Sequence, residues 1–298
     1  MKHEIANEQI EQVRNSFQKA LNRHGYGFQF GVLKIAEELA KKVDEDERSK
    51  WTFLFSEVPV QVQGFGTRID FVLSRHRALP SSPFFHLVCE CKRANPALSN
   101  WCFIRAPRTR RNQSKGADPL MLETIIQNSG VQLFKIIATT DTLVKDAYHF
   151  GVEVRSARQG DDKGESGKAI EDAVTQVLRG LNGYLEVLAQ HTQLVEGTIT
   201  YLLPVVFTTA QLWVSKADLG LAELATGDLD ISNDEFESVP WLWYQHHMSP
   251  GLKHSSISQP KDQVKIEEFI ESNYIRTIAI VSANGIEEFL LHTSGDFF

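Results

Sequence analysis

The chain has 298 residues and a net charge of −7. Its residues are 42% hydrophobic and 23% charged, which is ordinary for a globular protein. This composition excludes collagen-like and largely disordered chains. Three cysteines are too few for a disulfide framework, the N-terminal segment lacks the apolar core of a signal peptide, and no stretch approaches the roughly 18 apolar residues of a membrane span. We therefore expect a cytoplasmic protein without membrane contact.

Two amphipathic helices are predicted at the start of the chain. Over residues 5–23, apolar side chains recur at the spacing that brings them to one face of a helix. These side chains are Ile10, Val13, Phe17 and Leu21. A second helix is predicted over residues 28–43, where Glu37 lies off the apolar stripe, as expected for a solvated helix face.

Two predicted strands carry charges within apolar runs. Residues 67–73 are largely apolar but contain Asp70, and residues 85–92 begin as an apolar strand but contain Glu90 and Lys92. Charged side chains are rarely buried unless they are paired or bind a metal ion. These three charges therefore need either a partner or a function.

Strand geometry brings the three charges together. Successive side chains of a strand point to opposite faces, so Glu90 and Lys92 share a face. Antiparallel pairing about the connection at residues 74–84, which contains prolines and serines typical of turns, places Asp70 opposite Glu90. An oxygen-binding cation such as Mg²⁺ relieves the repulsion between two carboxylates, and Lys92 can orient or deprotonate a water molecule. The alternative is a salt-bridged pair at the end of a strand.

At these residues the sequence resembles the PD-(D/E)xK nuclease superfamily, which has the restriction-endonuclease-like fold. Asp70, Glu90 and Lys92 match the acid of one strand and the acid-x-Lys of the next, although Ile69 stands where the signature has proline. The resemblance covers roughly the first two thirds of the chain. It implies a Mg²⁺-dependent endonuclease, with Mn²⁺ as a substitute, that hydrolyses DNA rather than RNA and uses the Cys91 carbonyl as a further metal ligand.

The same resemblance implies accessory residues outside this motif. Glu57 interrupts an apolar strand predicted over residues 51–62, where superfamily members place an additional catalytic acid. Glu37 on the second helix is an alternative for that acid. A strongly amphipathic helix is predicted over residues 168–190 and contains Gln176. Some superfamily members place a glutamine of this helix near the site, and Gln176 corresponds to it. The alternative is that Gln176 takes no part in the site.

A basic segment follows Lys92, with Trp101 and Phe103 interleaved. Arginine and lysine neutralise phosphates and aromatic rings stack on bases, so we predict nucleic-acid contact here despite the negative net charge. The alternative is a solvated loop that happens to be basic. The basic residues are Arg93, Arg105, Arg108, Arg110, Arg111 and Lys115.

The remaining pattern predicts further elements. Residues 118–138 are predicted to be helical with a break near Ser129-Gly130, and residues 148–154 are predicted to form a short strand. Residues 199–207 are apolar throughout, which is typical of a strand covered on both faces, and Pro204 within them indicates a bulge or a sheet margin. Another strand is predicted over residues 276–281.

The fold class predicted from this order is α/β, with a restriction-endonuclease-like αβββαβ core whose central mixed sheet is flanked by helices. The core would occupy residues 1–215 with a large insertion at about residues 93–167. Residues 216–298 would form a C-terminal extension packed on the same domain.

Two further functions stay open beside the nuclease. An inactive module of the same fold would bind nucleic acid or a protein partner. Another phosphate-transferring enzyme is the weaker choice, because no glycine-rich phosphate loop is present. Members of the superfamily serve in restriction, phage defence, repair and mobile elements, and many act as homodimers or with an activator, but the sequence itself shows no interface.

Overall fold

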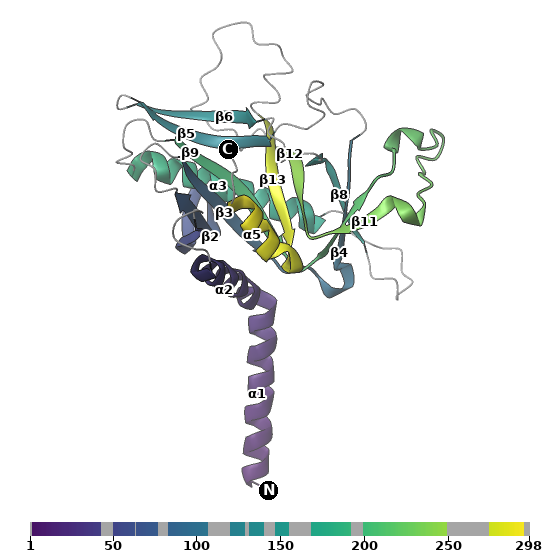
Figure 1. Ribbon diagram of the computed structural model, residues 1–298. Coiled ribbons are helices and arrows are strands. Elements are labelled where there is room, and N and C mark those ends of the chain that lie inside the picture. Colours follow the sequence, from purple (N-terminus) through teal and green to yellow (C-terminus); the bar gives the residue numbers. More distant parts are fainter. Residues whose placement is uncertain are drawn as a thin grey trace, which may run out of the picture.

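A mixed sheet of nine strands forms the centre of the molecule, and helices cover it (Figure 1). The protein is therefore of the α/β class. The computed structural model describes the chain except for residue 1 and residues 43–49, 63, 77–82, 107–119, 129–130, 140–146, 155–167, 192–198, 249–273 and 295–298. No helix of the described part is both long and apolar enough to cross a membrane.

The first half of the fold agrees with the predicted order of elements. Two helices precede three antiparallel strands that form one side of the large sheet. These elements are α1 (Lys2–His24), α2 (Tyr26–Lys42), β1 (Thr52–Val62), β2 (Phe65–His76) and β3 (Phe84–Lys92).

The sheet continues beyond β3 with strands from later in the chain, in the order β1-β2-β3-β9-β13-β12-β7, and a β5–β6 hairpin also pairs with β9. Strand β9 runs parallel to both β3 and β13. The bounds are β5 (Leu120–Asn128), β6 (Val131–Thr139), β7 (Ala147–Tyr148), β9 (Ile199–Thr208), β12 (Trp241–His247) and β13 (Ile275–Ser282).

A smaller sheet of four strands packs beside the large one, in the order β11-β10-β4-β8. Its strands are β4 (Asn100–Ile104), β8 (Phe150–Val154), β10 (Gln211–Ser215) and β11 (Phe236–Val239). Short 3-10 helices lie at Pro96–Leu98, Leu219–Leu221, Asn233–Glu235 and Ala283–Gly285.

Helices cover both faces of the large sheet and create two apolar cores. On one face, α3 (Lys168–His191) buries Val174 and Leu181 against sheet residues such as Val88. On the other face, α2 and α5 (Ile286–Ser294) bury Leu33 and Phe289 against the sheet. Each such side chain contributes about 1.5–3 kcal/mol when it is removed from water, so both layers hold the sheet in place.

Helix α3 approaches the sheet closely at Gly183. A β-carbon at this position would lie 2.5 Å from the Val60 side chain of β1. We expect Gly183→Ala to destabilise the protein by about 1–3 kcal/mol, because helix and strand must move apart. Gly31→Ala on α2 is the matched control, because its added carbon meets nothing within 4 Å. Urea denaturation measures both, and a Gly183→Ala protein as stable as wild type would contradict this packing.

The prediction of a helix over residues 118–138 is wrong, because residues 120–128 and 131–139 form the two strands of the β5–β6 hairpin. Asn128 pairs with Val131, so the Ser129-Gly130 dipeptide falls between two apolar runs. This dipeptide is a turn signal that divides the segment into two strands. Hydrogen bonding to neighbouring strands stabilises β5, whose residues 123–126 pair with β9.

The prediction that Pro204 marks a bulge or a sheet margin is also wrong, because β9 lies inside the sheet. Pro204 pairs with Val88 of β3 on one side. On the other side, β5 pairs with β9 only up to Leu202 and β13 pairs only from Val205 onward. Proline lacks a backbone N–H, and it stands where β9 changes neighbours and no ladder hydrogen bond is needed.

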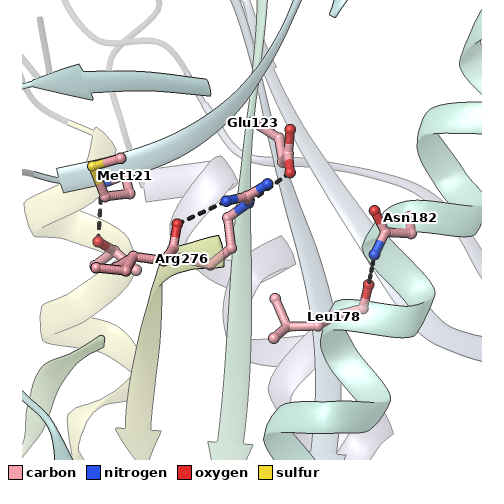
Figure 2. Close-up of polar contacts among 7 residues, drawn as sticks. Met121, Glu123, Leu178, Asn182 and Arg276 are labelled. Atoms are coloured by element: carbon pink, nitrogen blue, oxygen red, sulfur yellow. Dashed lines mark hydrogen bonds and ion pairs between the residues drawn. The ribbon is translucent and has the colours of Figure 1, made fainter. Parts of the chain in front are cut away.

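A buried ion pair joins two strands of the large sheet. Glu123 on β5 and Arg276 on β13 are 3% and 1% exposed, and Arg276 Nε donates to Glu123 Oε1 at 2.6 Å. Figure 2 shows the two side chains facing each other, with Asn182 of α3 in the same region. A buried charge that loses its partner is strongly destabilising, so this pair holds the two strands in one arrangement.

Candidate active site

An open cleft of about 670 Å³ lies where β1, β2 and β3 meet the start of α2 and one side of α3. Its lining is mostly polar. The charged and amide side chains that line it are Gln29, Glu57, Arg68, Asp70, Glu90, Lys92, Arg93 and Gln176.

The pairing of β2 with β3 brings Asp70 and Glu90 side by side. Phe71 pairs with Cys89 in an antiparallel register, so the next position along the two strands holds Asp70 and Glu90. The Cys91 N–H donates to Asp70 Oδ2 at 2.7 Å, which directs the Asp70 carboxylate across to β3. Lys92 lines the same cleft, so the three charges of the motif share it.

The two carboxyl groups are in an environment that disfavours their charge. Burial raises the pKa of Glu90 to about 9, and the negative charge of Asp70 adds to this shift while Lys92 opposes it. Burial also raises the pKa of Asp70 to about 6, against the hydrogen bond from the Cys91 N–H. A further positive charge would stabilise both ionised carboxylates.

Glu57 reaches the cleft through an unusual backbone conformation. The flanking residues Ser56 and Val58 pair with Phe71 and Ile69, so Glu57 lies across from Asp70. Its φ of 55° lies in the left-handed region, which costs about 1–2 kcal/mol for a residue with a side chain. This conformation accompanies two contacts that hold the Glu57 carboxylate at the cleft.

The two contacts use different oxygens of the Glu57 carboxylate. Gln29 Nε2 donates to Oε1 at 3.0 Å, and Arg68 donates to Oε2 at 2.9 Å. The Gln29 amide also donates to the Asp70 carbonyl oxygen at 3.0 Å, so it links α2 to β1 and β2. Gln29 is 3% exposed, as expected for a side chain whose polar atoms are satisfied by such contacts.

The sequence pattern pointed to Glu37 on the same helix and not to Gln29. Glu37 is exposed and is not among the residues that line the cleft. Gln29 lies on the buried stripe of α2, which includes Val32, Leu33 and Ala36. A polar residue at helical spacing within an apolar stripe is the signal that could have identified it.

The other predicted residues divide into three groups. Gln176 and Arg93 line the cleft, and the Arg93 guanidinium donates to the Asn22 carbonyl oxygen at the end of α1. Arg105 follows β4 and is not among the residues that line the cleft. The remaining basic residues lie outside the described part of the chain, so their contact with phosphate stays a prediction. They are Arg108, Arg110, Arg111 and Lys115.

The cleft contains few side chains that could bind a metal ion. Within the described residues, no group of three or more His, Cys, Asp or Glu side chains is arranged to hold a metal ion. Asp70 and Glu90 supply two carboxylates, and the Cys91 carbonyl lies between Glu90 and Lys92 in the chain. Proteins commonly bind Mg²⁺ through one or two carboxylates with several waters, so this set fits Mg²⁺ better than a metal that needs a full protein cage.

No protein-family model matches the chain, and no curated protein or solved structure matches it either. The function of the cleft must therefore be inferred from its own residues.

Proposed function

We propose that the cleft is the active site of a metal-dependent endonuclease that hydrolyses phosphodiester bonds of DNA. The observation that carries this proposal is the approach of Asp70 to Glu90 in neighbouring strands, with Lys92 two residues further along β3 and lining the same cleft. Two carboxylates and a lysine in an open polar cleft suit hydrolysis of a phosphate ester, in which negative charge must be held and offset.

The order of elements supports a restriction-endonuclease-like core. Helix α2, strands β1 to β3, helix α3 and strand β9 follow one another as α, β, β, β, α and β, apart from the segment that contains β4 to β8. Strands β1, β2, β3 and β9 are also consecutive in the sheet, and β9 is parallel to β3. Likeness of fold alone says little about activity, so the proposal depends on the site residues.

Asp70 and Glu90 would hold Mg²⁺ or Mn²⁺ together with the Cys91 carbonyl. Such an ion lowers the pKa of a bound water and offsets charge on the phosphate. The Lys92 ammonium would orient the attacking water and stabilise the negative charge that builds on the phosphate oxygens. Hydrolysis joins the water oxygen to phosphorus, breaks one P–O bond of the diester, and transfers a proton from the water to the leaving oxygen through solvent.

The surrounding residues would position this machinery. Gln29 fixes the Glu57 carboxylate and the Asp70 backbone through its two hydrogen bonds. Arg68 and Arg93 lie at the cleft and supply positive charge for the DNA backbone. Within the described part of the cleft these charges are few compared with a typical phosphate-binding surface, so we expect them to support only weak DNA binding with a shallow dependence on salt concentration.

The second candidate is a non-catalytic module that binds nucleic acid or a protein partner. Both oxygens of Glu57 already accept hydrogen bonds, and the net charge of the chain is −7. These observations favour a site in which Glu57 has a structural role and the carboxylates are not used for catalysis.

Cleavage assays on plasmid and single-stranded DNA with Mg²⁺, Mn²⁺ or EDTA distinguish the two candidates. We expect metal-dependent cleavage that Lys92→Ala lowers by about 100-fold, because a charge-stabilising donor is removed. Lys34→Ala is the matched control, because Lys34 is exposed on α2 and away from the cleft. DNA binding without cleavage by either protein would favour the module, and cleavage unchanged by Lys92→Ala would contradict the assigned site.

A further inference from the structure

Glu57 and Arg68 form an ion pair in the solvent-exposed part of the cleft. Arg68 Nη1 and Glu57 Oε2 are 2.9 Å apart, and both residues line the cleft. The Arg68 side chain is 59% exposed and the Glu57 side chain is 33% exposed. A charged ligand that enters the cleft can therefore reach both members of the pair.

Stability alone does not account for the backbone conformation of Glu57. Glu57 is the one residue other than glycine with a positive φ in the described part of the chain. An ion pair as exposed as this one contributes little to stability, because water and salt screen it. The bond from Gln29 to Glu57 Oε1 offsets part of the strain, but it does not involve Oε2. Strained residues concentrate at ligand clamps and switches, which indicates a role for the Arg68 contact beyond folding.

Arg68 is placed to receive a phosphate. It lies two residues before Asp70 on β2, so the two side chains share one face of the strand. Two positions of a strand span about 7 Å, so Arg68 would take a phosphate beside the one held at Asp70. A guanidinium can donate two parallel hydrogen bonds either to a phosphate or to a carboxylate. Glu57 therefore offers Arg68 the same kind of partner that a substrate would offer.

The other arginine of the cleft is held by a weaker acceptor. Arg93 donates to the carbonyl oxygen of Asn22, which carries no net charge. A phosphate displaces a neutral carbonyl readily, because a hydrogen bond between two charged groups is stronger. It has no such advantage over the Glu57 carboxylate. Arg68 is therefore the arginine whose availability the protein itself limits.

We propose that the Glu57 carboxylate stands in for a substrate phosphate at Arg68 and holds the cleft in a state of low affinity for DNA. This regulation rests on the proposed function, because it requires a phosphate backbone in the cleft. On binding, the phosphate takes Arg68, and Glu57 Oε2 turns to water while Oε1 keeps its bond from Gln29. One ion pair replaces another, so the gain in affinity from Arg68 is small while Glu57 is charged.

The exchange has a signature in the salt dependence of DNA binding. Each phosphate neutralised by an available arginine adds about 0.9 to the slope of log Kd against log salt concentration, because a bound cation is released. In the wild type, Glu57 loses its partner when Arg68 moves to the phosphate, and it attracts a cation in return. Arg68 therefore adds its full share to the slope only when residue 57 is uncharged.

Fluorescence anisotropy of a labelled DNA duplex, recorded in EDTA at several salt concentrations, tests the exchange. We expect Glu57→Gln to lower Kd by about 3- to 5-fold at about 0.1 M salt and to steepen the slope by about 0.9. The glutamine side chain keeps an oxygen that can accept from Gln29. Glu38→Gln is the matched control, because it removes a carboxylate from the exposed pair with Lys34 on α2, and it should change neither quantity.

Arg68→Met separates the release of Arg68 from simple charge repulsion. With this second substitution present, Glu57→Gln should lower Kd by less than about 2-fold and should leave the slope unchanged. Equal tightening with and without Arg68, or no tightening in its presence, would overturn the proposal.

The same measurements separate this exchange from the nuclease activity. Tightening that requires Arg68, in proteins that do not cleave DNA, would support the exchange and contradict the nuclease. Cleavage by the wild type together with an unchanged Kd in Glu57→Gln would overturn the exchange alone. No DNA binding by any of these proteins would overturn both.

Discussion

Glu90→Gln is expected to make the metal-free protein more stable and to remove its nuclease activity. Glu90 is buried beside Asp70, and burial together with the Asp70 charge raises its pKa to about 9. Glutamine has nearly the same shape but no charge, so it fits the site without ionisation. The same substitution removes one of the two carboxylates proposed to hold the metal, so cleavage should fall by about 1,000-fold or more.

The pH dependence of stability follows from the direction of this shift. The ordinary pKa of a glutamic acid is 4.5, so between about pH 4.5 and 9 the folded protein holds a proton on Glu90 that the unfolded chain releases. The metal-free wild type therefore loses stability from this group as the pH rises through that window. Each pH unit within that window corresponds to about 1.4 kcal/mol of stability lost by the wild type, and water in the open cleft reduces this amount. We therefore expect the free energy of unfolding of Glu90→Gln to exceed that of the wild type by about 2–4 kcal/mol at pH 8.

Chemical denaturation in EDTA at several pH values measures this gain. The difference in free energy of unfolding between Glu90→Gln and wild type should be small near pH 5 and should grow toward pH 8. Glu38→Gln on the exposed face of α2 is the control and should change stability little at any pH. A Glu90→Gln protein that is less stable than wild type at pH 8 in EDTA would show that Glu90 is held as a carboxylate by other groups.

Arg276→Met is expected to lower the free energy of unfolding by about 3–5 kcal/mol. Removal of Arg276 leaves the buried Glu123 carboxylate without the guanidinium that donates to it at 2.6 Å. The backbone of residue 276 would keep its place in β13, so the loss of stability measures the contribution of the Arg276 side chain. Thermal and urea denaturation both measure it.

A double variant separates the destabilisation caused by an unpaired buried charge from the destabilisation caused by lost packing. Glu123→Met with Arg276→Met should regain much of the stability, because two apolar side chains replace a buried ion pair at little net cost. The exposed pair of Lys216 with Glu237 provides the control, and Lys216→Met should cost less than about 1 kcal/mol. Equal losses in Arg276→Met and the double variant would mean that packing, and not charge, dominates at this position.

The elements around the cleft were predictable because each has a strong local pattern. The apolar period of α3 and the apolar run of β9 led to the correct elements. The approach of Asp70 to Glu90 followed from the turn residues between β2 and β3, since a hairpin pairs residues at equal distances from its turn. The register of Phe71 with Cys89 agrees with that expectation.

Other features depend on contacts that a local pattern does not contain. The β5–β6 hairpin has apolar runs that also suit a helix, and pairing with β9 favours the strands. Glu57 adopts a positive φ in a sequence without glycine at that position, and its contacts with Gln29 and Arg68 come from other elements. Such choices are made by tertiary structure, which the sequence alone did not supply.

The proposed metal site is tested most directly by a calorimetric titration of Mn²⁺ into wild type and into the double variant Asp70→Asn with Glu90→Gln. We predict one binding site per wild-type chain and none in the double variant, because the two carboxylates are the proposed ligands. No binding by wild type, or equal binding by both proteins, would contradict the claim that this pair of buried carboxylates forms a metal site.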